Sequence, residues 1–390
     1  MGKILEYIEK SGGGKYVCYK TKKLSLDISD NDTLSYDDKP VSEFKKSFFA
    51  ETDQCRKQTV RISDKLISST PPIFRFFLDG SRHTYKVDDI GIGKKIFPIV
   101  CGQIIVGCCE RKSRDEFKKY DIRQKLLISM PDDFAIDGNE ENFCRLYCEK
   151  LNKELESIKY IQERKLEFSK ILLYKTDGNT DFAQDKDNYK NRAIAKIQAE
   201  MTDEEQLLVA DLCNKNKLDD ESWLIKDGSL EYNPRFSNFA ITQWNNLRTN
   251  YNHVVGISKS FDPELIQDYE GNKLSKTIAI LHPFERTKVY KYESSHSGTS
   301  FAMWYLRLRN SNFRETQFSD VVKCEMVLLK DGQLIDTDIV NTISANIIRE
   351  AYPVCYGTDS RWANHLYPVF LTESFCKSHY IDSNIILSLF

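Results

Sequence analysis

The chain has 390 residues, 41% hydrophobic and 29% charged, which is enough to form a sizeable core in two domains or in one large elaborated domain. The net charge of -2 gives no overall electrostatic signature of nucleic-acid binding, so any nucleic-acid contact must come from a local basic patch or from metal ions. An odd number of cysteines (11), the lack of a secretory signal and the lack of an apolar run of about 18 residues together predict a cytoplasmic protein with reduced thiols and no membrane span.

The first 70 residues are polar and mixed, and we interpret them as an N-terminal extension that binds a partner or mediates dimerisation. An acidic, serine-rich loop is expected over 27–38, and a helix within 41–69 that is broken by Pro71-Pro72. The apolar run 73–78 then predicts a buried strand that stops at Asp79-Gly80. We expect 85–89 to be a linker.

The rest of the chain alternates between strand and helix patterns. The expected elements are a hairpin or two antiparallel strands at 96–109, helices at 142–170 and 191–212 around a polar break at 177–187, a strand at 223–226, a helix at 236–250, strands at 253–257, 303–308 and 321–329, and a helix at 336–351. This order predicts an α/β fold over 71–390. We interpret it as a ribonuclease-H-like mixed sheet flanked by helices, with a helical insertion at about 137–190.

Two Asp-Gly-Ser triplets, at Asp79 and Asp227, directly follow apolar strands. In such a sheet the ends of the first strand and of a later parallel strand can lie side by side, where α/β sheets bind ligands. Two carboxylates brought together repel each other unless cations bind between them, and their oxygens suit Mg²⁺ or Mn²⁺. The alternative interpretation is a pair of ordinary turns, as expected at Asp331-Gly332, because Asp-Gly is a strong turn signal.

Further candidates lie between and after the two triplets. Glu200, Glu204 and Glu205 lie on the helix before Asp227, where a glutamate facing the core is costly unless it is paired or bound to metal. A solvated acidic run is the other interpretation. Lys259 follows the strand at 253–257 and can contact a phosphate, or it is a surface lysine. His365 lies among aromatic residues, where a lone histidine is commonly structural.

Five short motifs resemble, in order and spacing, those of NurA-type nucleases. They are FFLDGS at 76–81, LIKDGSL at 224–230, VVGISKS at 254–260, WYLRL at 304–308 and YPVFL at 367–371. The resemblance covers residues 73 to about 385. It implies a ribonuclease-H-like core, Mn²⁺- or Mg²⁺-dependent DNA cleavage, and a homodimer that works with a HerA-type hexameric ATPase in DNA end processing or anti-phage defence.

The same resemblance implies roles for particular residues. Asp79 and Asp227 would be metal ligands, a glutamate of the 200–205 segment would be the third, with Glu205 favoured over Glu200, and Lys259 would lie at the phosphate. The late histidine or acidic position of the family falls near Phe375, and His365 is a candidate to replace it. With these ligands the expected chemistry is phosphodiester hydrolysis by two metal ions.

Two other functions fit the same residues. One is a ribonuclease-H-like or PIWI-like module that binds nucleic acid without cutting it, which the near-neutral charge favours. The other is a structural partner that docks an ATPase.

Overall fold

The structure is a computed structural model, and it describes residues 2–19, 23–26, 49–55, 57–113, 116–135, 140–176, 186–231, 241–268, 271–294, 297–309, 316–330, 332–355 and 362–390. The helices are α1 (Lys3–Ser11), α2 (Asp64–Ser69), α3 (Glu140–Leu155), α4 (Lys159–Arg164), α5 (Lys186–Asn214), α6 (Ile241–Leu247), α7 (Ser275–Ala279), α8 (Thr337–Glu350), α9 (Tyr367–Lys377) and α10 (Ser383–Leu389), with short 3₁₀ turns at Asp132–Phe134, Arg248–Tyr251 and Trp362–Asn364. The strands are β1 (Tyr16–Tyr19), β2 (Leu24–Ser25), β3 (Thr59–Arg61), β4 (Phe74–Ile92), β5 (Lys95–Ser113), β6 (Glu116–Pro131), β7 (Phe168–Tyr174), β8 (Trp223–Asp227), β9 (Val254–Ser258), β10 (Glu285–Thr287), β11 (Tyr290–Glu293), β12 (Ser300–Arg307) and β13 (Val321–Leu328).

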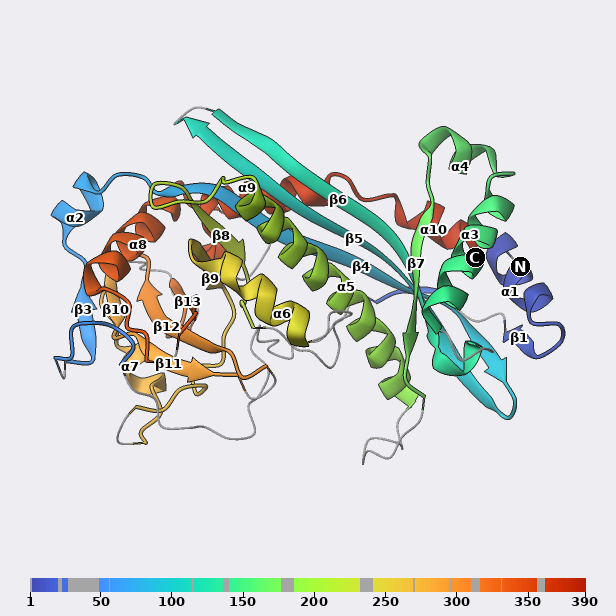
Figure 1. Ribbon diagram of the computed structural model, residues 1–390, viewed down its shortest axis with the longest axis horizontal. Coiled ribbons are helices and arrows are strands. Elements are labelled where there is room, and N and C mark those ends of the chain that lie inside the picture. The colour runs from blue at the N-terminus through green and yellow to red at the C-terminus, as the bar shows by residue number, and fades with distance from the viewer. Residues whose placement is uncertain are drawn as a thin grey trace.

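Over the described residues these strands form one mixed sheet, in the order β3-β10-β12-β13-β9-β8-β4-β5-β6-β7 with β1, β2 and β11 attached beside it. Strands β4, β5 and β6 are antiparallel, whereas β8 runs parallel to β4 and β9 parallel to β8. Figure 1 shows helix α5 running along the long strands. The expectation of a mixed sheet flanked by helices is therefore confirmed.

Helices α5 and α9 cover opposite faces of this sheet, as two glycines of β5 show. A Cβ atom built at Gly102 would lie 2.8 Å from Ile197 of α5, and one built at Gly107 would lie 2.4 Å from Cys376 of α9. Because side chains alternate along a strand, positions 102 and 107 face opposite sides. Each glycine lets a helix approach the sheet closely.

Strands β4 and β5 correct three predictions. β4 does not stop at Asp79-Gly80, because its ladder with β5 continues to Ile92, and 85–89 is part of the strand. Residues 96–109 belong to the single strand β5, and the chain reverses just before it, at Gly93, whose φ is +60°. Most of β5 is buried on both faces, so the alternation that marks a strand with one exposed face is missing from its sequence.

Other predictions have mixed outcomes. Strands near 223–226, 253–257, 303–308 and 321–329 and helices near 191–212 and 336–351 are confirmed. The structure adds β6, which we did not predict, and places β7 at the end of the segment expected to be helical. The expected helix at 236–250 is described only from 241, as α6 and a 3₁₀ turn. The loop at 27–38, most of the break at 177–187 and the first part of 41–69 lie outside the described residues.

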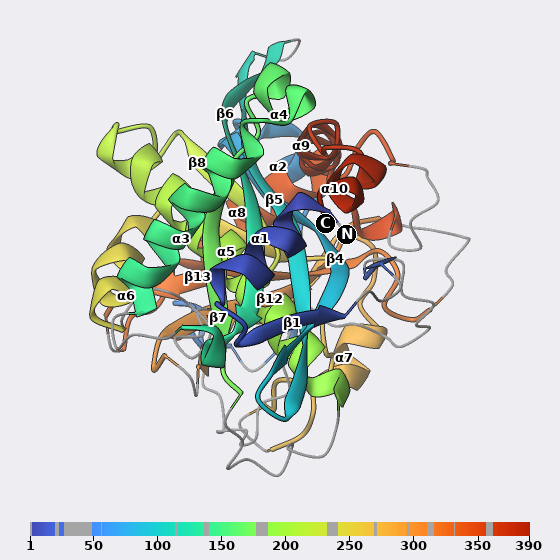
Figure 2. The ribbon, with the colours of Figure 1, turned by 90° about the vertical axis from the view of Figure 1, so that its right-hand side faces the viewer.

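The described parts of the first 70 residues contact two distant parts of the sheet. β1 pairs with the end of β4, and β3 pairs with β10. The backbone N–H of Gly2 donates to the carbonyl of Phe390 at 2.6 Å, so the first and last described residues are adjacent, as Figure 2 shows. Glu51 is fully buried and bonds to Arg286 of β10 at 2.8 Å.

Replacing Glu51 with alanine should lower the free energy of unfolding by about 3–5 kcal/mol, because breaking a buried ion pair leaves an unpaired charge in the core. Here the fully buried Arg286 would lose its carboxylate partner, whereas Lys288 would keep its bond to Asp53. Urea denaturation of the variant and the wild type measures the difference. A loss below about 1 kcal/mol, typical of an exposed pair, would contradict the buried position of Glu51.

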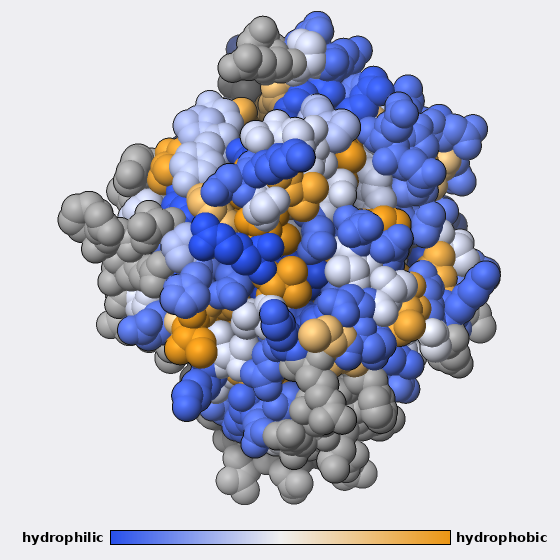
Figure 3. Space-filling model, turned by 90° about the vertical axis from the view of Figure 1, so that its left-hand side faces the viewer, coloured by the Kyte–Doolittle hydropathy of each residue, from blue (hydrophilic) through white to orange (hydrophobic). Residues whose placement is uncertain are grey.

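One end of the molecule, at the left of Figure 1, carries β3, β10, α7 and α8. Figure 3 shows that the described part of this face is mainly hydrophilic, with hydrophobic residues in a few small areas, as is usual for a surface that faces water. Within the described ranges, every helix is too short or too polar to cross a membrane.

Candidate metal centre

The two aspartates are brought together by the parallel pairing of β4 with β8. Leu78 pairs with Lys226 in the register of the two strands. The next residues, Asp79 and Asp227, are therefore neighbours on adjacent strands. This confirms the predicted juxtaposition of the two strand segments. The arrangement arises because β8 ends at Asp227 while β4, the neighbouring strand, continues past Asp79.

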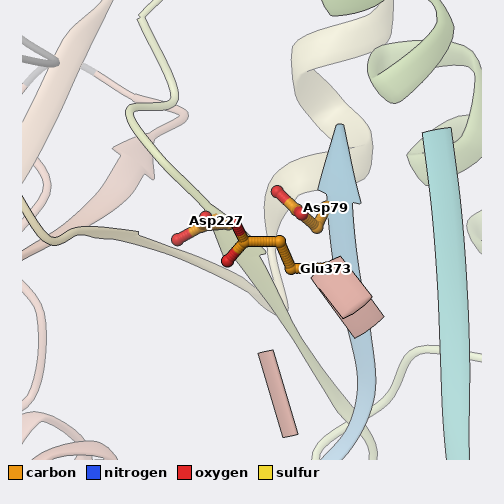
Figure 4. A group of neighbouring side chains, drawn as sticks. All are labelled: Asp79, Asp227 and Glu373. Atoms are coloured by element: carbon orange, nitrogen blue, oxygen red, sulfur yellow. The ribbon is translucent and has the colours of Figure 1, made fainter. Parts of the chain in front are cut away.

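A third carboxylate, Glu373 of α9, completes the group. Oxygen atoms of Asp79, Asp227 and Glu373 all lie within 4.8 Å of one another, and Figure 4 shows the three side chains gathered between β4, β8 and α9. Asp79 is only 5% exposed. Among the described residues, this is the one group of three or more histidine, cysteine, aspartate or glutamate side chains that could hold a metal ion.

The sequence analysis did not select Glu373, although the late acidic position implied by the resemblance falls two residues away, near Phe375. One sequence feature indicates Glu373: it is the single acidic residue of α9 and follows the apolar and aromatic stretch YPVFL by two positions. Its charge is offset along the helix by Lys377, 2.7 Å away. Helix α9 packs against β4 and β5, and this packing brings Glu373 to Asp79.

Lys259 and His365 both lie at this site. The Lys259 ammonium is 2.8 Å from Asp227 Oδ2 and 3.4 Å from Glu373 Oε2, and the lysine is only 6% exposed. His365 Nδ1 lies 3.9 Å from Glu373 Oε2. Asn364 fixes the lysine backbone by donating to the Lys259 carbonyl at 2.9 Å. Lys259 is therefore buried among the acidic side chains and is not a surface lysine.

Glu205 lies close to the aspartates but on the other face of the sheet. A Cβ atom built at Gly80 would lie 2.1 Å from Glu205 Oε1, so position 80 faces α5 and the neighbouring Asp79 faces α9. The carboxylate of Glu205 binds the Lys226 ammonium at 2.8 Å. In the structure, Glu205 is thus engaged with a lysine and does not belong to the group of three carboxylates.

Glu200 lies further from the site. Its two oxygens are 2.7 Å from Lys125 and 2.9 Å from Lys170, on β6 and β7. Glu204 pairs with Lys125 and Arg123. The acidic run on α5 is therefore largely matched by basic residues of the neighbouring strands, and the structure does not bring Glu200 to Asp79 or Asp227.

The group of carboxylates carries excess negative charge. Burial raises the pKa of Asp79 well above its ordinary value, and Asp227, Glu373 and Glu205 raise it further, although Lys259 opposes them. Burial alone would raise the pKa of Glu373, but Lys259, Lys377 and His365 lower it to about 2. Burial would lower the pKa of Lys259, but the surrounding carboxylates raise it.

This donor set fits a hard divalent cation. Carboxylate oxygens are the ligands that Mg²⁺ and Mn²⁺ prefer, and crowded like charges bind such a cation favourably. Burial is the main cause of the raised pKa of Asp79, and the neighbouring carboxylates add to it. The positive charge of Lys259 neutralises part of the negative charge of these carboxylates.

Replacing Asp79 with asparagine should stabilise the protein in EDTA near neutral pH. The pKa of Asp79 is raised from 3.8 on folding, so this carboxyl favours the folded state most below pH 3.8, and that contribution is lost as the pH rises through the raised pKa. Thermal unfolding at about pH 7.5 should show a higher midpoint for the variant. At about pH 4 the unfolding midpoints of the variant and the wild type should become nearly equal. A variant less stable than the wild type at both pH values would contradict this.

Comparison with known proteins gives a similar solved structure but no matching family. No protein-family model matches the chain, and no curated protein matches it. Among solved structures, the chain is similar to the crystal structure of the NurA nuclease from Sulfolobus solfataricus, with a TM-score of 0.39 and 11% identity over 80% of this chain and 83% of that one. A likeness at this level carries no argument about activity, and the function proposed below therefore rests on the acidic site.

Proposed function

We propose that the chain is a metal-dependent nuclease that hydrolyses phosphodiester bonds of DNA with Mg²⁺ or Mn²⁺. The observation that carries the proposal is the meeting of Asp79, Asp227 and Glu373 within 4.8 Å, beside a buried Lys259. Such a site binds hard cations and offers a lysine to a phosphate.

In this proposal the three carboxylates hold the metal. Two bound ions would supply an activated water and stabilise the leaving oxygen. Lys259, which contacts Asp227 and Glu373 in this structure, would contact a phosphate oxygen of the substrate when those carboxylates hold metal ions. His365, whose Nδ1 lies 3.9 Å from Glu373 Oε2, contributes to the electrostatic stabilisation of that carboxylate.

The topology supports a ribonuclease-H-like interpretation of the core. Three antiparallel strands, β4 to β6, are followed by β8 and β9, which are both parallel to β4, and the resulting order is β6-β5-β4-β8-β9. The sequence predicted a hairpin followed by parallel strands, but it placed the hairpin within 96–109 and missed β6. The observed strand order puts the candidate ligands at the edge where β8 ends.

The direct test is cleavage of end-labelled linear DNA by the purified full chain in Mn²⁺, in Mg²⁺ and in EDTA. Cleavage that needs the metal supports the proposal. If isothermal titration shows no Mn²⁺ binding by the full chain, the metal centre is wrong, whether or not a partner is needed for activity.

One contact favours the non-cleaving alternative, in which the domain binds nucleic acid without hydrolysing it. The Lys259 ammonium already lies between Asp227 and Glu373, where it can act in place of a metal ion. Salt-dependent DNA binding without cleavage in any divalent metal would favour this alternative.

The Lys259→Met variant separates the two functions. In a nuclease, the loss of the phosphate contact should lower the cleavage rate by about 10²-fold or more, while Mn²⁺ binding is kept or tightened. In a non-cleaving module, the wild type should bind Mn²⁺ weakly, and the variant should gain affinity without gaining cleavage. Calorimetric Mn²⁺ titration and the DNA assay, run on both proteins, distinguish these results.

For partners, we propose a homodimer that acts with a HerA-type hexameric ATPase in the cytoplasm, in DNA end processing or anti-phage defence. The support is the motif resemblance described above. Co-expression with such an ATPase, followed by size-exclusion chromatography, tests the association. If the two proteins form a complex that neither cuts nor binds DNA, the chain is instead a structural partner of the ATPase.

A further inference from the structure

Behind the metal centre, on the α5 face, four buried charged side chains surround the turn that carries Asp227. They form two ion pairs. Lys226 lies 2.8 Å from Glu205, and Lys323 lies 2.5 Å from Glu325. The side chains of all four are at most 7% exposed. Burying such pairs costs free energy that an apolar core would not cost, so their contacts deserve a specific explanation.

Both pairs bond to the turn itself. The Lys226 ammonium donates to the carbonyls of Asp227 at 3.0 Å and Ser229 at 3.3 Å. Glu325 Oε2 accepts from the backbone N–H of Leu230 at 2.8 Å and from the Ser229 hydroxyl at 2.9 Å. Polar groups of three turn positions, 227, 229 and 230, are thus fixed by one lysine and one glutamate.

The fold makes room for this contact across a whole strand. Glu325 lies on β13, which is separated from β8 by β9, and it pairs in register with Gly256 of β9. A Cβ atom at position 256 would lie 2.6 Å from the Leu230 side chain and 3.1 Å from the Gly228 carbonyl. The missing side chain lets the turn cross β9 and reach Glu325. Gly228, with φ at +82°, supplies the left-handed conformation that starts the crossing.

We propose that Lys226 and Glu325 are positioning residues, which fix the turn 227–230 so that the Asp227 carboxylate meets Asp79 and Glu373 on the opposite face. The inference rests on the metal centre of the proposed function. Groups that orient a metal ligand from behind change metal affinity about 10–100-fold when they are removed. A purely structural pair changes stability and leaves affinity unchanged.

The test compares two double variants of the full chain, Lys323→Met/Glu325→Ala and Lys323→Met/Glu325→Gln. Both remove the buried charges of one pair, but only the glutamine keeps an acceptor for Leu230 and Ser229. Mn²⁺ affinity is measured from the electron paramagnetic resonance signal of the free ion. We expect binding at least about tenfold weaker with alanine and within about threefold of wild type with glutamine.

Other outcomes contradict the proposal in distinguishable ways. Wild-type affinity in the alanine variant, or equal weakening in both variants, overturns the positioning role alone. If the wild type binds no Mn²⁺, the metal centre fails and the positioning role fails with it. If the alanine variant does not fold, Ser229→Ala is used instead. It removes one of the two hydrogen bonds that Glu325 accepts and leaves the Lys323–Glu325 ion pair intact. It should weaken binding about threefold, and unchanged affinity there overturns the role.

Glu51→Gln is the matched control. It alters a buried ion pair of the same kind, with Arg286, but on β10 and the N-terminal segment. Its Mn²⁺ affinity should equal that of the wild type even if its thermal stability falls. A loss of affinity in this control would mean that affinity follows overall stability, which also overturns the positioning role.

Discussion

Replacing both aspartates with asparagine, Asp79→Asn together with Asp227→Asn, is expected to reduce DNA cleavage by at least about 10³-fold and to abolish Mn²⁺ binding. The two residues supply two of the three carboxylates that lie within 4.8 Å of one another. Asparagine keeps the size of the side chain but removes the charge, and a neutral amide is a poor ligand for a hard cation. Cleavage of labelled linear DNA and calorimetric Mn²⁺ titration measure the two effects.

Each single variant should lose nearly as much activity as the double variant, because residues that act as a unit are strongly non-additive. Asp211→Asn is the control, since Asp211 is a partly exposed residue of α5 that pairs with Arg123 away from the site. The assay is run with and without a HerA-type ATPase, because an activity that depends on a partner would leave the isolated protein nearly inactive. Mn²⁺ binding by the double variant equal to that of the wild type would rule out the site.

The closeness of the two aspartates could be predicted because the strands before them are recognisable from local sequence. β8 and β9 are short, apolar and followed by turn residues, and the order of elements implied that β8 would lie parallel beside the first strand. The position of Lys259 follows from the same pattern, because it comes just after the end of β9. These features depend on neighbours in sequence and on a general rule of sheet topology.

The third carboxylate of the group could not be predicted in the same way, because its position depends on which helix covers which face of the sheet. Glu205 and Glu373 both lie on helices next to the aspartates, and helical periodicity does not specify the face. The structure shows α5 on the Gly102 side and α9 on the Gly107 side. Lys226, hidden within the apolar run of β8, binds Glu205 on the first side. The burial of both faces of β5 likewise concealed the length of that strand.

The comparison of Glu373→Gln with Glu205→Gln therefore decides between the site seen in the structure and the one favoured by the sequence. Both substitutions remove one negative charge from a buried or half-buried glutamate and keep its length. We expect Glu373→Gln to weaken Mn²⁺ binding by about 10²-fold or more and to abolish cleavage, because Glu373 belongs to the group of three carboxylates. Glu205→Gln should weaken Mn²⁺ binding by less than about tenfold, because the Glu205 carboxylate binds Lys226 on the opposite face of the sheet.

The pH dependence of binding gives a second measurement for the same pair. The pKa of Glu373 is lowered to about 2, so this residue is charged at any pH near neutrality, whereas the raised pKa of Asp79 makes a proton compete with the cation. Mn²⁺ affinity of the wild type should therefore fall as the pH is lowered and Asp79 takes up its proton. Glu373→Gln removes a neighbouring negative charge that raises the pKa of Asp79, so the fall should shift to lower pH. If instead Glu205→Gln abolishes binding while Glu373→Gln keeps it, the glutamate of α5 is the ligand and its bond to Lys226 must break when the metal binds.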